Sequence, residues 1–218
     1  TIPNFIKYIY SSAFENCNSL SEIEIPEDSE IDTIPIYFAN KHITSLFIPK
    51  NVERMKSLWC CLAYILNNVI ISPSNKNFKY LDDEHQIIIG KSDAKSDMFD
   101  TIIFASRNIQ RVTIPKNIKC IKGHAFDNCK QLKSVEFQKD SELAKINNFA
   151  FCDSSLESII IPKSVSKIGN GAFFSCKNLQ KVSIEEGSKL QSLANDSFFS
   201  CEKLEEVYIP ENSSLRVI

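Results

Sequence analysis

Apolar residues recur along the chain in one short pattern that returns about every 23–25 residues. One clear copy consists of Ala125, Phe126, Cys129, Leu132, Val135 and Phe137, and related copies begin at Ala13, Ala150, Ala172 and Ser197. The first four positions have offsets 0, 1, 4 and 7, which place apolar groups on one face of a short helix. The last two alternate with polar residues, as in a strand. Each unit is therefore predicted to be a short helix followed by a short strand.

The strand pattern sets the unit boundaries. Eight units end near residues 25, 48, 71, 114, 137, 161, 184 and 209, and a ninth begins at Leu215. The fourth unit is longer than the others because it contains an inserted stretch, residues 72–105. No unit of this size can bury its apolar face alone, so we expect the units to stack with their strands in parallel, about 4.8 Å apart. The prediction is one α/β solenoid domain over residues 1–218.

Composition narrows the function classes. The 25 Lys and Arg residues nearly balance the 27 Asp and Glu residues, so the whole-chain charge does not favour binding to nucleic acid or to anionic membranes. The longest apolar run, residues 58–66, is about half of what a membrane-spanning helix needs. We therefore expect no nucleic-acid partner and no direct membrane insertion. The chain has only five glycines, and they are scattered, so we expect no glycine-rich loop that binds phosphate.

The eight cysteines permit three interpretations: buried thiols, a disulfide framework or a metal site. Cys17, Cys129, Cys176 and Cys201 share one repeat position that is predicted to face the core, where a small polarizable side chain packs well. Cys60 and Cys61 are adjacent, and the sequence contains no C-x-x-C spacing. Buried, reduced thiols are the favoured interpretation, and we expect no metal.

The positions of the three histidines do not indicate a catalytic site. His42, His85 and His124 lie in different units, and none belongs to an H-E-x-x-H motif, so we expect solvated loop residues. Cys120 and His124 are four residues apart, but no third orienting group repeats nearby. The chain is therefore predicted not to be an enzyme and to need no cofactor.

The outward positions of the strands are the candidate partner-binding site, because side chains at these positions form a grid across stacked parallel strands. The candidate residues are Phe47, Ile70, Arg111, Thr113, Glu136, Ile160 and Tyr208. Several are large and apolar where solvent is expected. Two explanations remain open: the strand preference of β-branched and aromatic residues, or a patch that binds a partner, with Phe47 and Ile70 adjacent in the stack.

The repeat I-P-x-x-V-x-x-I-x-x-x-A-F-x-x-C-x-x-L-x-x-V-x-I resembles the BspA-like (Treponema pallidum-type) leucine-rich repeats of bacterial and protist surface proteins. Residues 115–209 match it closely, residues 1–48 well and residues 49–114 loosely, with Trp59 at a position that is Ala or Ser elsewhere. The stretch at 72–105 resembles a hairpin insertion found in that family. The resemblance implies a leucine-rich repeat solenoid with an inserted β-hairpin.

The same resemblance implies a non-enzymatic, protein-binding surface antigen, on the cell surface or secreted, that mediates adhesion to a host protein or an extracellular matrix component. The alternative is an intracellular structural or adaptor module in the cytoplasm, which the apparently reduced cysteines favour. The sequence starts and stops inside a unit. We therefore expect a fragment of a longer array that self-associates end to end.

Overall fold

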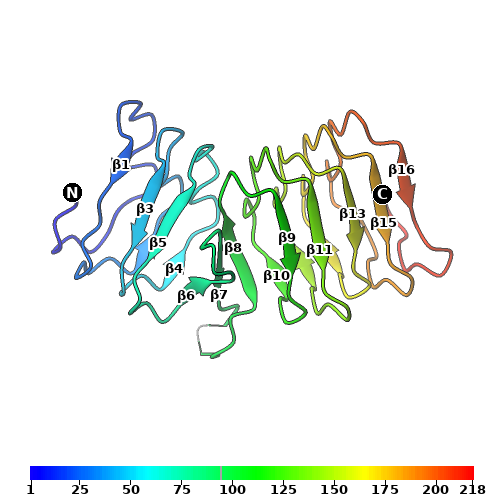
Figure 1. Cartoon of the computed structure of the whole chain (residues 1–218), viewed down its shortest axis with the longest axis horizontal. Coiled ribbons are helices and arrows are strands. Elements are labelled where there is room, and N and C mark those ends of the chain that lie inside the picture. Colours follow the sequence, from blue (N-terminus) through cyan, green and yellow to red (C-terminus); the bar gives the residue numbers. More distant parts are fainter. Residues whose placement is uncertain (94) are drawn as a thin grey trace. The chain divides into compact units, whose positions relative to one another are not determined.

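The computed structural model describes residues 1–93 and 95–218, which divide into two compact units. Unit 1 comprises residues 1–99 and 105–107, and unit 2 comprises residues 100–104 and 108–218. Each unit is a run of parallel β-solenoid turns, and the chain passes through about eight turns in all (Figure 1). A typical turn contributes one short strand to each of two sheets.

Unit 1 contains two parallel sheets and one antiparallel pair. Its first sheet has the order β1-β3-β5, formed by β1 (Glu22–Ile23), β3 (Ser45–Ile48) and β5 (Asn68–Ile71). Its second sheet pairs β2 (Thr33–Ile34) with β4 (Arg54–Met55). The antiparallel pair, β6 (Phe78–Tyr80) and β7 (Ile87–Gly90), lies in the stretch where the sequence predicts a hairpin.

The hydroxyl of Tyr80 on β6 satisfies main-chain groups of β5. It accepts a hydrogen bond from the Ile71 amide and donates one to the Val69 carbonyl, both at 2.9 Å. A strand edge with free amides and carbonyls can pair with other chains. The side chain of Tyr80 thus occupies part of the edge that a further strand would use.

Unit 2 contains the longer sheets, whose strands lie side by side in Figure 1. The first sheet has the order β9-β11-β13-β15-β16, formed by β9 (Arg111–Ile114), β11 (Ser134–Phe137), β13 (Ser158–Ile161), β15 (Lys181–Ile184) and β16 (Glu206–Tyr208). The second contains β8 (Thr101–Ala105), β10 (Cys120–Ile121), β12 (Lys145–Ile146) and β14 (Lys167–Ile168). The parallel stacking predicted from the repeat is confirmed.

The predicted helices are wrong: the described residues contain strands and turns but no helix. In residues 147–154, the amides of Ala150, Cys152 and Ser154 each bond to a carbonyl three residues earlier, at 3.2 Å. Phe149 and Asp153 have φ angles of 55° and 56°. Left-handed residues at this spacing prevent a right-handed helix from propagating. The fold class is therefore a parallel β-solenoid rather than an α/β solenoid.

The intervening amides of residues 149–153 bond to the next turn. Those of Phe149, Phe151 and Asp153 donate to carbonyls in residues 170–174 over 2.8–3.0 Å. Amides therefore alternate between a partner within the turn and a partner in the neighbouring turn. This alternation satisfies backbone groups that burial would otherwise leave unpaired, and it explains why spacing typical of a helix face can encode a stack of turns.

Phenylalanines from successive turns form the centre of the core in unit 2. The rings of Phe126, Phe151 and Phe173 are fully buried and nearly parallel, with neighbouring centroids 4.9 and 5.3 Å apart. Phe198 continues the stack at 5.3 Å from Phe173. In unit 1, Phe14 contacts Phe38 edge to face at 5.7 Å. The inward position predicted for the repeated phenylalanine is confirmed in the buried turns.

The cysteine position supplies a hydrogen-bond donor as well as packing volume. The Cys176 thiol donates to the carbonyl of Phe151 at 3.0 Å, and the Cys201 thiol donates to that of Phe173 at 3.2 Å. In unit 1, the Asn40 amide donates at 3.3 Å to the carbonyl of Phe14. Each side chain thus reaches back to a carbonyl of the preceding turn. Burial is confirmed for Cys129 and Cys176.

The prediction of burial is wrong for Cys17, which is exposed, and incomplete for Cys201, which is half-buried. Cys17 belongs to the first described turn. No disulfide joins the cysteines of the described residues.

Replacement of Phe151 by Ala should lower the free energy of unfolding by about 3–5 kcal/mol, because it removes the middle ring of a close-packed stack. Chemical denaturation followed by circular dichroism measures this change. Ile160→Ala serves as the control, because Ile160 is 59% exposed and its truncation should change stability by about 0.5 kcal/mol or less. Equal losses in the two variants would contradict this description of the core.

Candidate functional site

The outward face of the first sheet in unit 2 carries five of the predicted partner-binding residues. Strand register places Glu136 beside Thr113, and places Ile160 and Tyr208 on either side of Ser183. Arg111 lies beside Ser134, in the column at the start of the strands. The grid predicted from the repeat is therefore present on this sheet.

Exposure distinguishes the apolar members of this grid from the core. Ile160 is 59% exposed and Tyr208 is 48% exposed, whereas Ile159 and Ile161, the neighbours of Ile160 on β13, are buried. Arg111, Thr113 and Glu136 are also exposed. The face thus combines polar groups with two large apolar side chains that protrude from a flat sheet.

Phe47 and Ile70 form a separate group in unit 1. They are direct partners across β3 and β5, so their predicted adjacency is confirmed. Ile70 is 45% exposed, but Phe47 is half-buried, so less of its ring is available to a partner than the alternation pattern suggests. The candidate residues therefore form two groups, one in each compact unit.

Ion pairs between successive turns border the strand face of unit 2. The ammonium groups of Lys133 and Lys181 lie 3.9 and 3.0 Å from the carboxylates of Glu157 and Glu206. In the turn segments, the pairs Lys130–Asp153 and Lys177–Glu202 are separated by 2.8 and 2.9 Å. Exposed pairs of this kind each contribute about 0–1 kcal/mol. Their main effect is to neutralise charge along this side.

These ion pairs were not predicted from the sequence. The signal was available, because Lys133 and Glu157 occupy the same position of consecutive repeats, as do Lys181 and Glu206. Comparison of charges at equivalent positions would have found them. The average charge of the whole chain conceals them.

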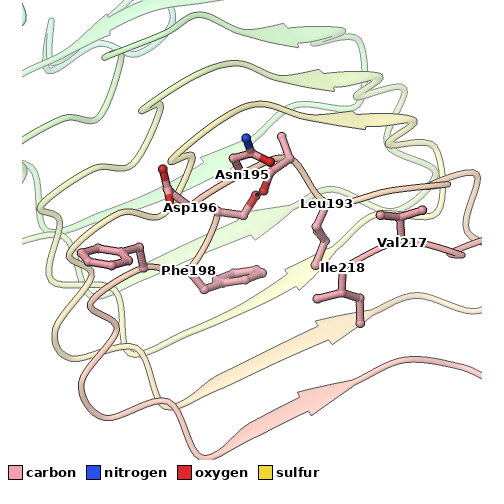
Figure 2. Close-up of a pocket in the computed structure, with 9 residues that line it drawn as sticks. Leu193, Asn195, Asp196, Phe198, Val217 and Ile218 are labelled. Atoms are coloured by element: carbon pink, nitrogen blue, oxygen red, sulfur yellow. Dashed lines mark hydrogen bonds between the residues drawn. The ribbon is translucent and has the colours of Figure 1, made fainter.

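The last described turn of unit 2 carries a pocket of about 460 Å³. Figure 2 shows Leu193, Phe198 and Ile218 around it, together with the polar side chains of Asn195 and Asp196. Ile218 is 83% exposed. The pocket lies at the end of the phenylalanine stack, where it presents the type of surface on which one solenoid turn packs against the next.

The histidines differ from the sequence prediction. His85 is exposed, but the His124 side chain is 11% exposed, and its Nδ1 lies 2.8 Å from the carboxylate of the buried Asp127. The His124 ring also stacks on Phe149, with centroids 5.4 Å apart. His42 is half-buried. The predicted solvent exposure is thus confirmed only for His85. The tight turns place the rings of His42 and His124 against neighbouring residues.

Cys120 is not prepared for nucleophilic attack. Burial raises the pKa of its thiol, although a hydrogen bond from the Asn147 amide to Sγ, at 3.1 Å, opposes the rise. An activated nucleophilic cysteine requires the opposite shift. The described residues also contain no group of three or more His, Cys, Asp or Glu side chains that could hold a metal ion.

The thiols of Cys176 and Cys201, in consecutive turns, contact each other. The contact with Cys176 lowers the pKa of Cys201, and the same contact together with burial raises the pKa of Cys176. Cys152 lies in a different setting, where burial and the nearby Asp127 carboxylate raise its pKa. Among these three thiols, Cys201 ionises first.

A family model described as the BspA-type leucine-rich repeat region, with six copies, matches residues 1–81 and 98–216. The chain belongs to this family. The match covers both compact units, and this family model describes repeats rather than a catalytic domain. No helix in the described residues is long and apolar enough to cross a membrane.

Two solved structures show the same fold as the BspA-type repeats of this chain. A leucine-rich cell surface protein from Faecalibacterium prausnitzii is 19% identical, with a TM-score of 0.59 over 92% of this chain. A leucine-rich repeat protein from Eubacterium ventriosum is 20% identical, with a TM-score of 0.64 over 84% of this chain. The chain spans 62% and 53% of the lengths of those two proteins. No curated protein matches the chain in sequence.

The pKa shifts predict an order of thiol alkylation in the folded protein. At about pH 8, iodoacetamide should modify Cys201 before Cys120 and Cys152, because the thiolate is the nucleophile and a lowered pKa increases its fraction. Mass spectrometry of digested samples measures the rate at each site. In urea, where the native contacts are lost, the three rates should become similar. Faster native modification of Cys152 than of Cys201 would contradict the prediction.

Proposed function

We propose that the chain is a non-enzymatic scaffold that binds another protein through the outward face of its first sheets. The observation that supports this most is the pair Ile160 and Tyr208, which protrude from the five-stranded sheet of unit 2. A binding interface commonly has an apolar or aromatic centre with polar groups around it. Thr113, Glu136 and Arg111 supply such polar groups on the same sheet.

The stacked strands make this face a rigid platform. Each candidate side chain is attached to a strand whose backbone pairs with its neighbours, so its position is fixed before a partner arrives. Rigid presentation reduces the conformational entropy that is lost on binding. Ile70 and Phe47 offer a second, smaller apolar group on the corresponding sheet of unit 1.

For the biological setting, we infer a surface or secreted protein that adheres to a host protein or an extracellular matrix component. Membership in the BspA-type family supports this, as does the likeness to a protein described as a leucine-rich cell surface protein. The alternative, a cytoplasmic adaptor, is favoured by the lack of disulfides among the cysteines of the described residues, because secreted proteins commonly oxidise theirs.

Binding to purified extracellular matrix proteins, immobilised on a biosensor, tests the scaffold proposal. The double variant Ile160→Ser with Tyr208→Ser should bind at least about tenfold more weakly than the parent, because it removes the apolar centre of the face. Its melting temperature should stay within a few degrees, since both side chains are largely exposed. Phe47→Ser with Ile70→Ser tests the group in unit 1 in the same way.

The double variant Tyr64→Ser with Ile65→Ser is the matched control. It removes the same two residue types, with exposures of 46% and 44%, from a turn segment instead of a strand. Binding of the control should remain within about twofold of the parent. If the strand variants bind as well as the parent, or if the control loses as much affinity, the strand face is not the binding surface.

We also propose that copies of the chain associate through the pocket at the last turn of unit 2. The exposed side chains of Val217 and Ile218 and the end of the phenylalanine stack support this, because burying apolar surface favours association. Sedimentation velocity should show mass that increases with concentration. Ile218→Lys should shift the protein toward monomer, because it places a charge in the contact. A parent that stays monomeric at high concentration would contradict self-association.

A further inference from the structure

Lysines occupy the outward face of the second sheet in unit 2. Lys145 on β12 and Lys167 on β14 are direct partners in the parallel pairing, and both are exposed. Parallel strands lie about 4.8 Å apart, so the two side chains start from neighbouring points. The position next in line on β10 is Cys120, which is flanked by the exposed Lys119 and the half-buried Lys122. We call the four lysines, Lys119, Lys122, Lys145 and Lys167, the lysine face.

Cys120 provides a second indication that the lysines gather here. Burial raises the pKa of its thiol, the charges of Lys122 and Lys145 both oppose that rise, and the buried Asp100 carboxylate adds to it. The two ammonium groups, which come from different turns, therefore act on the same point of the surface. Cys120 and Asn147 complete this part of the face with a hydrogen bond of 3.1 Å.

The lysine face differs from the opposite side of each turn in how charge is arranged. Beside the first sheet, Lys133 and Lys181 meet carboxylates of the next turn. On the second sheet, by contrast, Lys145 meets Lys167. Within residues 1–93 and 95–218, none of the four lysines forms an ion pair. Like charges directly opposite each other across strands are destabilising, and a bound anion would remove that cost.

We propose that the lysine face binds a linear sulfated polysaccharide. Strands β10, β12 and β14 have two residues each, and each strand presents one outward side chain, which is Lys145 on β12, Lys167 on β14 and the uncharged Cys120 on β10. Lys119 and Lys122 flank Cys120, so consecutive turns bring four lysines to this side. A polysaccharide with closely spaced sulfate groups can follow such a row across the turns. It needs neither an apolar pocket nor a stacking surface, and the outward positions of these strands provide neither.

The composition of the face argues against other polyanions. Single-stranded nucleic acids usually bind where aromatic side chains stack on bases, and β10, β12 and β14 contain no aromatic residue. They also contain no arginine, whose planar fork suits phosphate groups. An acidic peptide would gain from apolar anchors between the charges, but the isoleucines of these strands are buried. Charge attraction alone remains, and it is the chief requirement of a sulfated polysaccharide.

Binding of a size-defined heparin oligosaccharide to the full chain tests the proposal. The parent should bind at physiological salt, about 0.15 M, and its affinity should fall as salt increases, because each neutralised anionic group releases counterions. Lys145→Ser with Lys167→Ser should weaken binding about 5–30-fold at about 50 mM NaCl. The number of counterions released on binding, measured from the slope of log affinity against log salt concentration, should fall by roughly one to two. Lys145→Arg with Lys167→Arg should retain most of the affinity, because it keeps both charges.

The control variant is Lys133→Ser with Lys181→Ser, which removes two lysines from the other side of the turns and gives the same net charge. Its affinity should remain within about twofold of the parent, because those lysines already face carboxylates. The test variants are independent of the proposed protein-binding face, since Lys145 and Lys167 lie on the second sheet.

Three results would overturn the proposal. The parent could fail to bind heparin at physiological salt. The two serine double variants could lose affinity equally, which would indicate attraction to total charge instead of to this face. An oligothymidylate or a polyglutamate with the same number of charges could bind as tightly as heparin, with the same dependence on Lys145 and Lys167, which would assign the face to nucleic acid or to an acidic protein segment.

Discussion

Hydrogen bonding between successive turns is the constraint on which this structure depends. In a turn segment such as residues 147–154, some amides bond within the turn, the Asn147 amide bonds to the preceding turn, and the amides of Phe149, Phe151 and Asp153 bond to the turn that follows. A single turn would therefore leave buried polar groups without partners, each costing about 1–3 kcal/mol. The phenylalanine stack obeys the same rule, because the ring of Phe151 is buried by Phe126 and Phe173 from the two adjacent turns.

This dependence also explains the residue choices at the cysteine position. Cys176 and Cys201 reach carbonyls of the preceding turn, and Asn40 does so in unit 1 with a longer, more polar side chain. Several turns thus place a hydrogen-bond donor at this position, whereas the buried Ala63 fills it with packing volume alone. Ser154 fills it in another turn, where its hydroxyl lies 3.3 Å from the Cys176 sulfur.

The sequence predicted the strands of the first sheets, their parallel order and the buried phenylalanines, because period-two alternation and the recurring pattern leave few other solutions. It did not predict the two-residue strands of the second sheets, such as β12 and β14, because two residues are too few to show an alternation. It failed for the helices, because apolar spacing alone does not reveal left-handed residues such as Phe149 and Asp153. The predicted solvent exposure of His124 was wrong, because the tight turn brings its ring against the Asp127 carboxylate, and this turn geometry cannot be read from the sequence. The exposure of Ile160 followed from alternation, whereas the half-burial of Phe47 did not.

The distribution of charge, like the environment of His124, depends on how the turns stack and not only on the composition of the chain. The near balance of acidic and basic residues describes the chain as a whole, but stacking sorts those residues by their position in the repeat. Lys181 meets Glu206 on one side of a turn, while Lys145 meets Lys167 on the other. A surface can therefore be strongly polarised within a chain whose net charge is only −2.

The inter-turn hydrogen bonds in unit 2 join residues separated by nearly one repeat length, such as Phe151 and Ala172 or Phe173 and Ser197. Removal or duplication of one whole repeat would leave every other bond of this kind with the same partner type at the same separation. Genetic recombination between copies of the repeat can thus change the length of the array without redesigning its core. Changes of one or two residues within a turn segment lack this freedom, because they shift donors away from acceptors on both adjacent turns. Evolution of such a chain should accordingly proceed by gain and loss of complete turns and by substitution at outward positions.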